Sequence, residues 1–490
     1  MQLTAAALLA ALSLVSASPL AKRDVSVPFQ GKTFVNKGLV GFGRVSSELR
    51  DSFGETLGGL GSAIALESFS TDAAGKATFS LLMQPDRGHN TQVTTDYRAR
   101  HHRFTGTFDA AATGPAENVA LTYKNTQLYR IADPKFGLNF TTGLDPTGSR
   151  APLLQRNILL PIAAPNNHVS FDPEGLAIDR RGFYYVSDEY GANVYVVEQR
   201  TGLVVSTITP PAAVIPLIGG KANFTSETVP DSGRAPNQGL EGLTLDQSKG
   251  GLLWGLMQSA LVQDSTKSSK ETNRYARLFG WDVSNPLRAR LVHEYVVPLP
   301  QSKKLRTRAS SELHIVDGNT FLVLARDGNG FGDTSSDSSY KQADLISTVG
   351  ATDIAGSKYD QPQNPVAPGG VLDASVTPTA YQSFVDLVNK KELAKFGLQT
   401  GGAFDRTLIA SKLESLALAK LPNSDDALLF VVSDSDFITK NGFQAAEQKR
   451  GQYVVAPYSD PYAEQYGNAD TQVFIYRVTL PGYSQPSVKK

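Results

Sequence analysis

The stretch DPEGLAIDRRGFYYVSDEYG, residues 172–191, contains a phrase that recurs along the chain. An acidic residue and then Gly or Ser precede Leu-Ala or Leu-Thr, and an apolar strand ending in Ser-Asp or a similar pair follows. Further copies are GLEGLTL with LLWGLMQS (residues 239–259), KLESLAL with LLFVVSDSDF (412–437) and a shorter SEL with FLVLARD (311–327). If such repeats close into a ring, their repeated polar residues meet at a common axis. The repeat therefore bears on both the fold and the site.

The remainder of the chain favours an all-β fold, because short β-rich runs alternate with Gly, Asp, Asn and Pro turns. The motif glutamates Glu174, Glu241, Glu312 and Glu414 are separated by 67, 71 and 102 residues. These intervals are somewhat longer than the roughly 40–50 residues of a propeller blade. We recognise five copies of the repeat, and a mature chain of about 465 residues has room for six or seven blades, so we expect a β-propeller of six or seven blades. A β-sandwich is the structural alternative, but a single sandwich would not generate repeats this long.

The longest interval is expected to contain one irregular insertion, residues 331–410. Its first part is rich in Ser, Asp, Gly, Gln and Pro, and its second part contains the clearest helical periodicity of the chain, over residues 379–396. A weaker copy of the repeat lies earlier, at residues 59–66. Ring closure is expected to pair a strand at residues 39–45 with the C-terminal strand at residues 473–478.

The N-terminal residues predict a secretory leader. An apolar run over residues 3–15, followed by small residues, indicates a signal peptide of residues 1–17. The run is too short to span a bilayer as a helix. Residues 18–23 then form a short pro-segment ending in Lys-Arg, and residues 24–490 form a single domain. We expect a secreted, extracellular protein.

The composition limits the partners. Lys plus Arg and Asp plus Glu each number 47, so no net charge attracts nucleic acid or an anionic membrane. We expect a monomer that binds a small molecule. The absence of cysteine excludes disulfides, thiolate metal sites and cysteine nucleophiles. Two Asn-Phe-Thr triplets predict glycosylation at Asn139 and Asn223.

Taken together, the motifs resemble those of the secreted phytase-like proteins, a family described by an esterase-like activity of phytase. The resemblance rests on residues 172–191, 238–259 and 412–437, with 86–88 and 325–327 also fitting. It implies a β-propeller whose Glu and Asp residues form a hydrolytic, phosphoesterase-like site. The copy at residues 59–66 departs from the pattern, because Ser62 and Ala63 stand where an acidic residue is expected.

The recurring carboxylates suggest a metal site. Carboxylates gathered around one axis repel one another and need cations, protons or basic side chains to coexist. Ca²⁺, the ion we expect, takes six to eight oxygen ligands. The candidate ligands come from the strand starts and strand ends: Glu174, Glu241, Glu312, Glu414, Asp188 and Asp434. The structural alternative is that the same residues satisfy backbone N–H groups or pair with arginines of a neighbouring blade.

Other residues suit the remaining steps of ester hydrolysis. Arg87 and Arg326 can make bidentate contacts to phosphate oxygens. His89, next to Arg87 in a turn, is the histidine best placed to contact a substrate. Glu189 or Asp436 would serve as the base that activates water, if one of them stands free of the metal.

The familiar hydrolase signatures are absent: the sequence has no Gly-x-Ser-x-Gly elbow, no His-Glu-x-x-His and no P-loop. His101 and His102 stand among arginines and are expected on a solvated, basic surface strand. The favoured function is metal-assisted hydrolysis of a phosphoric ester at an acidic ring in the propeller channel. The alternatives are a propeller lactonase or other carboxylic-ester hydrolase, and a non-catalytic binding propeller stabilised by calcium.

Overall fold

The structure is a computed structural model that describes residues 24–89, 95–112, 114–133, 137–151, 159–247, 251–267, 269–449 and 452–485. The predicted leader and pro-segment lie outside these residues. The few helices are α1 (Lys390–Leu393), α2 (Pro461–Tyr466) and the 3₁₀ turns η1 (Ala212–Val214), η2 (Val262–Asp264), η3 (Pro286–Arg288), η4 (Lys358–Asp360), η5 (Pro368–Gly370) and η6 (Ala394–Phe396). None of the helices in the described ranges is long and apolar enough to cross a bilayer. The all-β prediction is confirmed.

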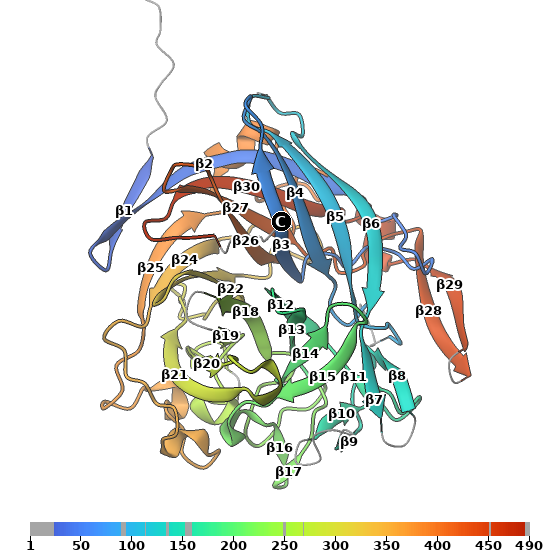
Figure 1. Ribbon diagram of the computed structural model, residues 1–490, viewed down its shortest axis with the longest axis vertical. Coiled ribbons are helices and arrows are strands. Elements are labelled where there is room, and N and C mark those ends of the chain that lie inside the picture. The colour runs from blue at the N-terminus through green and yellow to red at the C-terminus, as the bar shows by residue number, and fades with distance from the viewer. Residues whose placement is uncertain are drawn as a thin grey trace, which may run out of the picture.

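Five sheets of four or more strands form the body of the described structure (Figure 1). The first contains β3 (Ala63–Thr71), β4 (Lys76–Gln84), β5 (Arg100–Asp109) and β6 (Val119–Leu128). The second begins with β12 (Pro173–Asp179), β13 (Phe183–Asp188), β14 (Val194–Glu198) and β15 (Leu203–Ile208). The third contains β18 (Leu240–Asp246), β19 (Leu252–Met257), β20 (Tyr275–Asp282) and β21 (Arg290–Pro298). The fourth contains β22 (Ala309–Asp317), β23 (Thr320–Arg326), β24 (Lys341–Ser347) and β25 (Ala380–Asp386).

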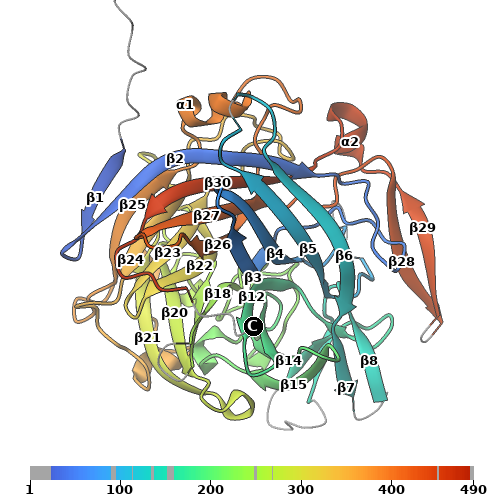
Figure 2. The same cartoon turned by 45° about the horizontal axis from the view of Figure 1, so that its top comes forward.

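The fifth sheet joins the two ends of the chain. Its order is β26 (Leu413–Lys420), β27 (Asp426–Ser433), β30 (Thr471–Thr479), β2 (Lys32–Val45) and β1 (Val25–Phe29). Leu39 pairs with Tyr476 and Phe42 with Phe474, which confirms the predicted pairing of the N-terminal and C-terminal strands. Figure 2 shows β2 lying along β30.

The first strands of the five sheets contact one another in the order β3, β12, β18, β22, β26 and again β3. They lie around one axis near the centre of Figure 1. Among the described residues there are thus five such sheets, fewer than the six or seven blades expected from the sequence. The difference arises because long stretches of chain extend or connect sheets instead of forming new ones.

Three regions of the described chain extend an existing sheet or form a separate hairpin instead of a new blade. β7 (Arg130–Asp133), β8 (Gly137–Thr142), β11 (Val169–Ser170), β10 (Leu160–Ile162) and β9 (Gly148–Arg150) extend the second sheet beyond β15. Two separate hairpins are formed by β16 (Leu217–Ile218) with β17 (Lys221–Ala222) and by β28 (Gly442–Lys449) with β29 (Gln452–Tyr458). The chain length therefore overestimates the number of sheets, whereas the five copies of the repeat match the five sheets.

The predicted insertion at residues 331–410 requires correction, because it supplies β24 and β25 of the fourth sheet. The predicted helix over residues 379–396 is largely wrong. Its first half is strand β25, paired with β24, and the helix begins only at Lys390, where the Asn389 side chain accepts hydrogen bonds from the first turn. Pairing with β24 prevails over the helical spacing because it buries the adjacent Phe384 and Val385 together.

Apolar side chains fill the spaces between neighbouring sheets. Phe79 of the first sheet and Phe430 of the fifth have ring centroids 5.0 Å apart. Trp254 of the third sheet and Phe321 of the fourth are 5.1 Å apart. Because the sheet faces carry the hydrophobic core, the polar residues at the strand ends are left to face the axis.

Candidate functional site

The motif glutamates owe their position to β-bulges at the start of the innermost strands. The pairing of the first two strands shifts there in four sheets. The extra residue is Glu241 in the third sheet and Glu414 in the fifth, and Glu174 lies within the bulge of the second. A bulged residue does not pair with the neighbouring strand, and its side chain therefore points in a different direction from that of a regularly paired residue. These three glutamates line one cavity on the axis.

Glu312 does not join them. In the fourth sheet the bulged residue is Ser311, and Glu312 occupies the next position. Its Oε1 accepts hydrogen bonds from the N–H groups of Leu243 at 3.1 Å and Leu313 at 2.8 Å, and its side chain lines a different cavity of about 780 Å³. The alignment of Glu312 with the other glutamates is therefore wrong by one position. The sequence contained the signal: the others stand two residues before a leucine, whereas Glu312 directly precedes one.

The axial cavity has a volume of about 240 Å³ and a wall made only of polar and charged residues. Seven carboxylates and three cations are among them. The lining residues are Asp86, Arg87, Asp172, Glu174, Glu189, Asn237, Glu241, Gln258, Arg326, Lys412, Glu414 and Asp436. The excess of carboxylates makes this a cation-binding environment.

One side of the cavity contains the glutamate cluster, which we define as Glu174, Glu189 and Glu241. Each offers a carboxylate oxygen, and these oxygens lie within 4.8 Å of one another. The donors to this cluster are uncharged. Ser62 Oγ donates to Glu174 at 2.7 Å, the Gly239 N–H to Glu189 at 3.3 Å, and the side-chain amide of Gln258 to Glu241. The cluster has the oxygen ligands that a divalent cation requires. Its basic neighbours, Arg87 and Arg234 near Glu189 and Arg326 and Lys412 near Glu241, act on it electrostatically.

At the other side lies the aspartate cluster, defined as Asp86, Asp434 and Asp436, whose oxygens also lie within 4.8 Å of one another. Asp86 and Asp436 line the cavity, whereas the buried Asp434 is not among its lining residues. Here the protein supplies its own cation, the ammonium group of Lys412. Lys412 Nζ lies 2.5 Å from Asp434 Oδ2, 3.4 Å from Asp436 Oδ1 and 3.6 Å from Asp86 Oδ2. Glu414 Oε2 is also 3.6 Å from this ammonium. A third set of oxygens, from Asp86, Asp172 and Glu174, connects the two clusters.

Both predicted arginines line the cavity. Arg87 Nη1 lies 3.6 Å from Asp172 Oδ2 and donates to Ser226 Oγ at 3.2 Å. Arg326 Nε donates to Ser311 Oγ at 3.1 Å, and its Nη2 binds Glu414. Each guanidinium is thus held at the cavity wall by a carboxylate and a serine hydroxyl of the protein.

Two other predicted site residues lie away from the cavity wall. Asp188 is fully buried and accepts backbone hydrogen bonds from Asp172 at 3.0 Å and Gly191 at 2.8 Å, so its carboxylate holds the corner after β13. His89 stacks on Tyr458, with ring centroids 4.1 Å apart, and burial lowers its pKa. Each interacts electrostatically with one lining carboxylate, Asp188 with Asp172 and His89 with Asp436, but neither lines the cavity itself.

Burial dominates the protonation of the cavity. It raises the pKa of Asp86 and Asp172 to about 7. Burial and repulsion by neighbouring carboxylates raise the pKa of Glu174 and Glu241 well above the usual range. For Lys412 the burial is outweighed by the surrounding carboxylates, so its pKa is raised well above the ordinary value. Near neutral pH the metal-free cavity therefore retains protons, with which a divalent cation would compete.

The environments of His101, His102 and the glycosylation triplets differ from one another. His101 and His102 are buried, not solvated, and His101 Nδ1 lies 3.0 Å from the Tyr129 hydroxyl. Their predicted surface position is wrong because other side chains cover them. The His101 ring packs against Tyr184 of the second sheet, with centroids 4.9 Å apart, and His102 Nδ1 lies 2.7 Å from Thr126 Oγ1. Asn223 is half-buried and its Oδ1 accepts a hydrogen bond from Thr225 N–H at 3.1 Å. The side chain of Asn139 lies outside the described residues.

Sequence reasoning missed several lining residues, above all Lys412, Asp172 and Gln258. A signal for two of them exists. Lys412 and Asp172 each stand two residues before a motif glutamate, so they occupy one repeated position with opposite charges. A positive charge in one repeat and a negative charge at the same position of another indicate that the two side chains contact different neighbours near the axis.

The chain is similar to a known protein family over most of its length. A family model described as phytase-like, with an esterase-like activity of phytase, matches residues 64–437, a range that contains all twelve lining residues of the cavity. An uncharacterized secreted protein of Arthroderma benhamiae is 35% identical over 460 residues, covering 84% of this chain and 88% of that protein.

The solved structures that resemble this chain do so with low sequence identity and low TM-scores. A protein of unknown function from Dyadobacter fermentans is 12% identical with a TM-score of 0.29, covering 90% of this chain and 99% of that one. The PQQ-bound aldose sugar dehydrogenase of Streptomyces coelicolor is 10% identical with a TM-score of 0.26, covering 68% and 99%. Scores this low support no conclusion about this chain.

Proposed function

Because the chain belongs to the phytase-like family, described by an esterase-like activity of phytase, we propose that it is a secreted hydrolase that cleaves phosphoric esters with the help of a divalent cation. The predicted leader and the secreted relative support secretion. The five sheets around one axis support a β-propeller in which the axial cavity is the active site. The observation that carries the proposal is the presence of the glutamate cluster and two arginines in one cavity.

The glutamate cluster fits a hard cation, and Ca²⁺ is the ion we favour. Glu174, Glu189 and Glu241 present oxygens close enough to share one ion, with no cationic side chain among their hydrogen-bond donors. When bound, the ion would neutralise a phosphate group and polarise its P–O bonds. It would also offset the excess of carboxylates, without which an anionic ester would be repelled.

The protein's own residues supply the rest of the chemistry. Arg87 and Arg326 would contact the phosphate oxygens. Asp436, whose side chain is 28% exposed, is better placed than Glu189 to take a proton from the attacking water, since Glu189 belongs to the glutamate cluster. Water adds to phosphorus as the P–O bond to the alcohol breaks. Asp172, whose pKa burial raises to about 7, would return a proton to that leaving oxygen.

The character of the wall favours a phosphate over a lactone. A lactone or carboxylic ester needs an apolar surface beside an open metal position, whereas every lining residue of this cavity is polar or charged. A purely structural role would require all of the acidic residues to be paired with fixed cations. Lys412 supplies such a cation to the aspartate cluster, but the donors to the glutamate cluster are uncharged.

The test is Glu241→Gln, with Glu312→Gln as the matched control. Both residues are buried glutamates on innermost strands, but only Glu241 lines the acidic cavity. We expect Glu241→Gln to weaken Ca²⁺ binding and to lower hydrolysis of a phosphomonoester by about tenfold or more, whereas Glu312→Gln retains both. Unchanged Ca²⁺ affinity in a folded Glu241→Gln protein would contradict the proposal.

A further inference from the structure

Lys412 occupies the position where a second divalent cation would otherwise fit. The three oxygens of the aspartate cluster are as close together as those of the glutamate cluster. The ammonium group lies within 3.6 Å of a carboxylate oxygen from each of Asp86, Glu414, Asp434 and Asp436. On this side of the cavity the Lys412 ammonium therefore offsets carboxylate charge as a bound metal ion would.

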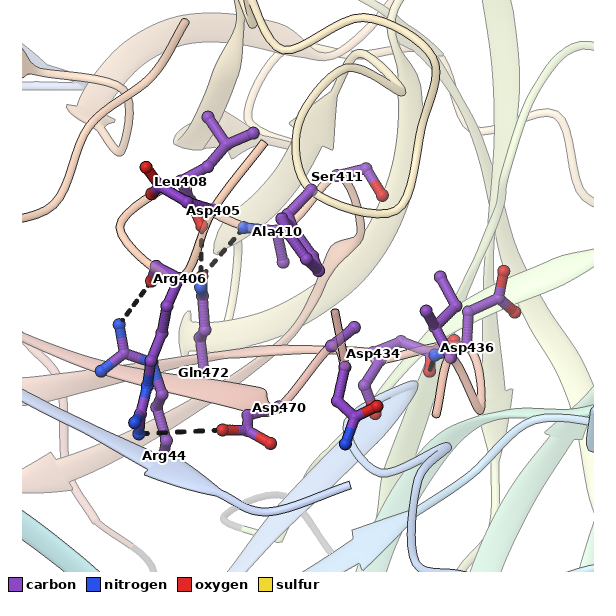
Figure 3. A pocket seen from close by; sticks show the side chains of 15 residues that line it. Arg44, Asp405, Arg406, Leu408, Ala410, Ser411, Asp434, Asp436, Asp470 and Gln472 are labelled. Atoms are coloured by element: carbon purple, nitrogen blue, oxygen red, sulfur yellow. Dashed lines mark hydrogen bonds and ion pairs between the residues drawn. The ribbon is translucent and has the colours of Figure 1, made fainter. Parts of the chain in front are cut away.

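The backbone before Lys412 is anchored from several directions. The Ser411 N–H donates to the Phe331 carbonyl at 2.8 Å, and the Ser411 carbonyl accepts from the buried Lys341 Nζ at 2.6 Å. Just upstream, Gln472 accepts from Ala410 N–H at 2.9 Å (Figure 3). The same view shows Asp434 and Asp436 beside this segment. These contacts hold the lysine at the cluster, so an incoming ion would have to displace a tethered cation.

Displacement would be costly. The Lys412 side chain is only 24% exposed, and an ammonium expelled from four carboxylates in this enclosed region would lose its partners. The linking set of Asp86, Asp172 and Glu174 is likewise partly engaged, because Lys412 contacts Asp86 and Arg87 contacts Asp172. Free coordination capacity is thus concentrated in the glutamate cluster.

We infer that Lys412 is a built-in counter-ion that excludes divalent cations from the aspartate cluster and confines them to the glutamate side of the cavity. The inference rests on the proposed cation-binding role of this cavity. It also deepens that role, because an aspartate cluster free of metal leaves Asp436 able to accept a proton from water. Lys412 is a positioning residue in this scheme and does not itself react.

Lys412→Met tests the inference. Removing the ammonium leaves four carboxylates without their common cation, so the variant should bind about one more Ca²⁺ per chain than the wild type. Its melting temperature should fall by several degrees in chelator and recover with Ca²⁺. Lys412→Arg should behave as the wild type. Bound metal is counted by elemental analysis and calorimetric titration, and stability by thermal melting.

Lys37→Met is the matched control. Lys37 is similarly exposed, 29% against 24% for Lys412, but its Nζ binds the single carboxylate of Asp426, which does not line the acidic cavity. Its loss should lower the melting temperature without creating a Ca²⁺ requirement. A folded Lys412→Met protein with no additional ion and no Ca²⁺-dependent stability would overturn the inference.

A measurement on the wild type covers the case in which Lys412→Met does not fold. Crystals soaked in MnCl₂ should show anomalous scattering at the glutamate cluster and none among Asp86, Asp434 and Asp436. A Mn²⁺ ion within the aspartate cluster, with Lys412 displaced, would overturn the inference. A wild type without any bound ion would contradict the proposed function alone, since an additional Ca²⁺ in Lys412→Met would still support the role of Lys412.

Discussion

Ser62 Oγ donates a hydrogen bond to Glu174 Oε2 at 2.7 Å, although the two residues are 112 positions apart in the sequence. Ser62 belongs to the repeat that lacks an acidic residue, directly before β3, and Glu174 lies in the bulge of the neighbouring sheet. The apparent gap in the acidic ring is therefore occupied by a donor that orients a carboxylate of the glutamate cluster. A hydroxyl at this position adds no further negative charge to the cavity.

Ser62→Ala should weaken Ca²⁺ binding. The loss of one hydrogen bond to a carboxylate costs about 1–2 kcal/mol, which corresponds to roughly a five- to thirtyfold rise in the dissociation constant. Ser70→Ala is the control, because its hydroxyl pairs with Thr78 on an exposed part of the same sheet. Calorimetric titration of both variants measures the effect. Equal affinities in the two variants would remove Ser62 from the site.

Arg87→Met should impair substrate binding while leaving the metal in place. Its guanidinium lines the cavity beside Asp172 and Ser226 but does not contribute a ligand to the glutamate cluster. We expect the KM for a phosphomonoester to rise about tenfold or more, with the Ca²⁺ stoichiometry unchanged. The exposed Arg290→Met provides a baseline for the loss of a surface ion pair. An unaltered KM would indicate that phosphate does not contact Arg87.

The chelated protein should become less stable as the pH rises from about 4 to about 7. Burial raises the pKa of Asp86 and Asp172 from 3.8 to about 7, so the folded state retains protons that the unfolded chain has released. Since the folded state binds more protons, its stability falls with rising pH through this window and levels off above it. Urea unfolding of metal-stripped protein at pH 5 and pH 8 measures the difference. Higher stability at pH 8 would show that these carboxyls ionise freely in the fold.

Asp188→Asn should destabilise the fold without acting on the metal. The Asp188 carboxylate accepts backbone hydrogen bonds from Asp172 and Gly191, and an asparagine would lose part of this acceptor capacity. We expect a loss of about 2 kcal/mol in the free energy of unfolding. Asp282→Asn, in an exposed pair with Arg290, should leave the stability nearly unchanged, because surface ion pairs contribute little. A weaker Ca²⁺ affinity in folded Asp188→Asn would instead return this residue to the ligand set.

The sequence predicted the features that depend on repetition and alternation. The recurring strands, the pairing of residues 39–45 with the C-terminal strand and the approach of Glu174, Glu241 and Glu414 to one cavity all follow from patterns along the chain. These patterns could be read from the sequence because repeated positions along the chain occupy equivalent positions in the sheets.

Features set by contacts between distant segments could not be predicted in the same way. The change from helix to strand over β25 depends on pairing with β24. The role of Lys412 follows from its contacts with carboxylates of two sheets and their connections. Neither strand pairing nor such contacts are encoded in local spacing alone.

The most direct test of the account is a titration of metal-stripped protein with Ca²⁺, in which bound ion and phosphomonoester hydrolysis are measured on the same samples. Hydrolysis should be absent from the stripped protein and rise in proportion to occupancy of the glutamate cluster, with Glu241→Gln reducing both. Hydrolysis that persists at full rate without a divalent ion, or full occupancy without hydrolysis of any phosphoric ester, would contradict the account.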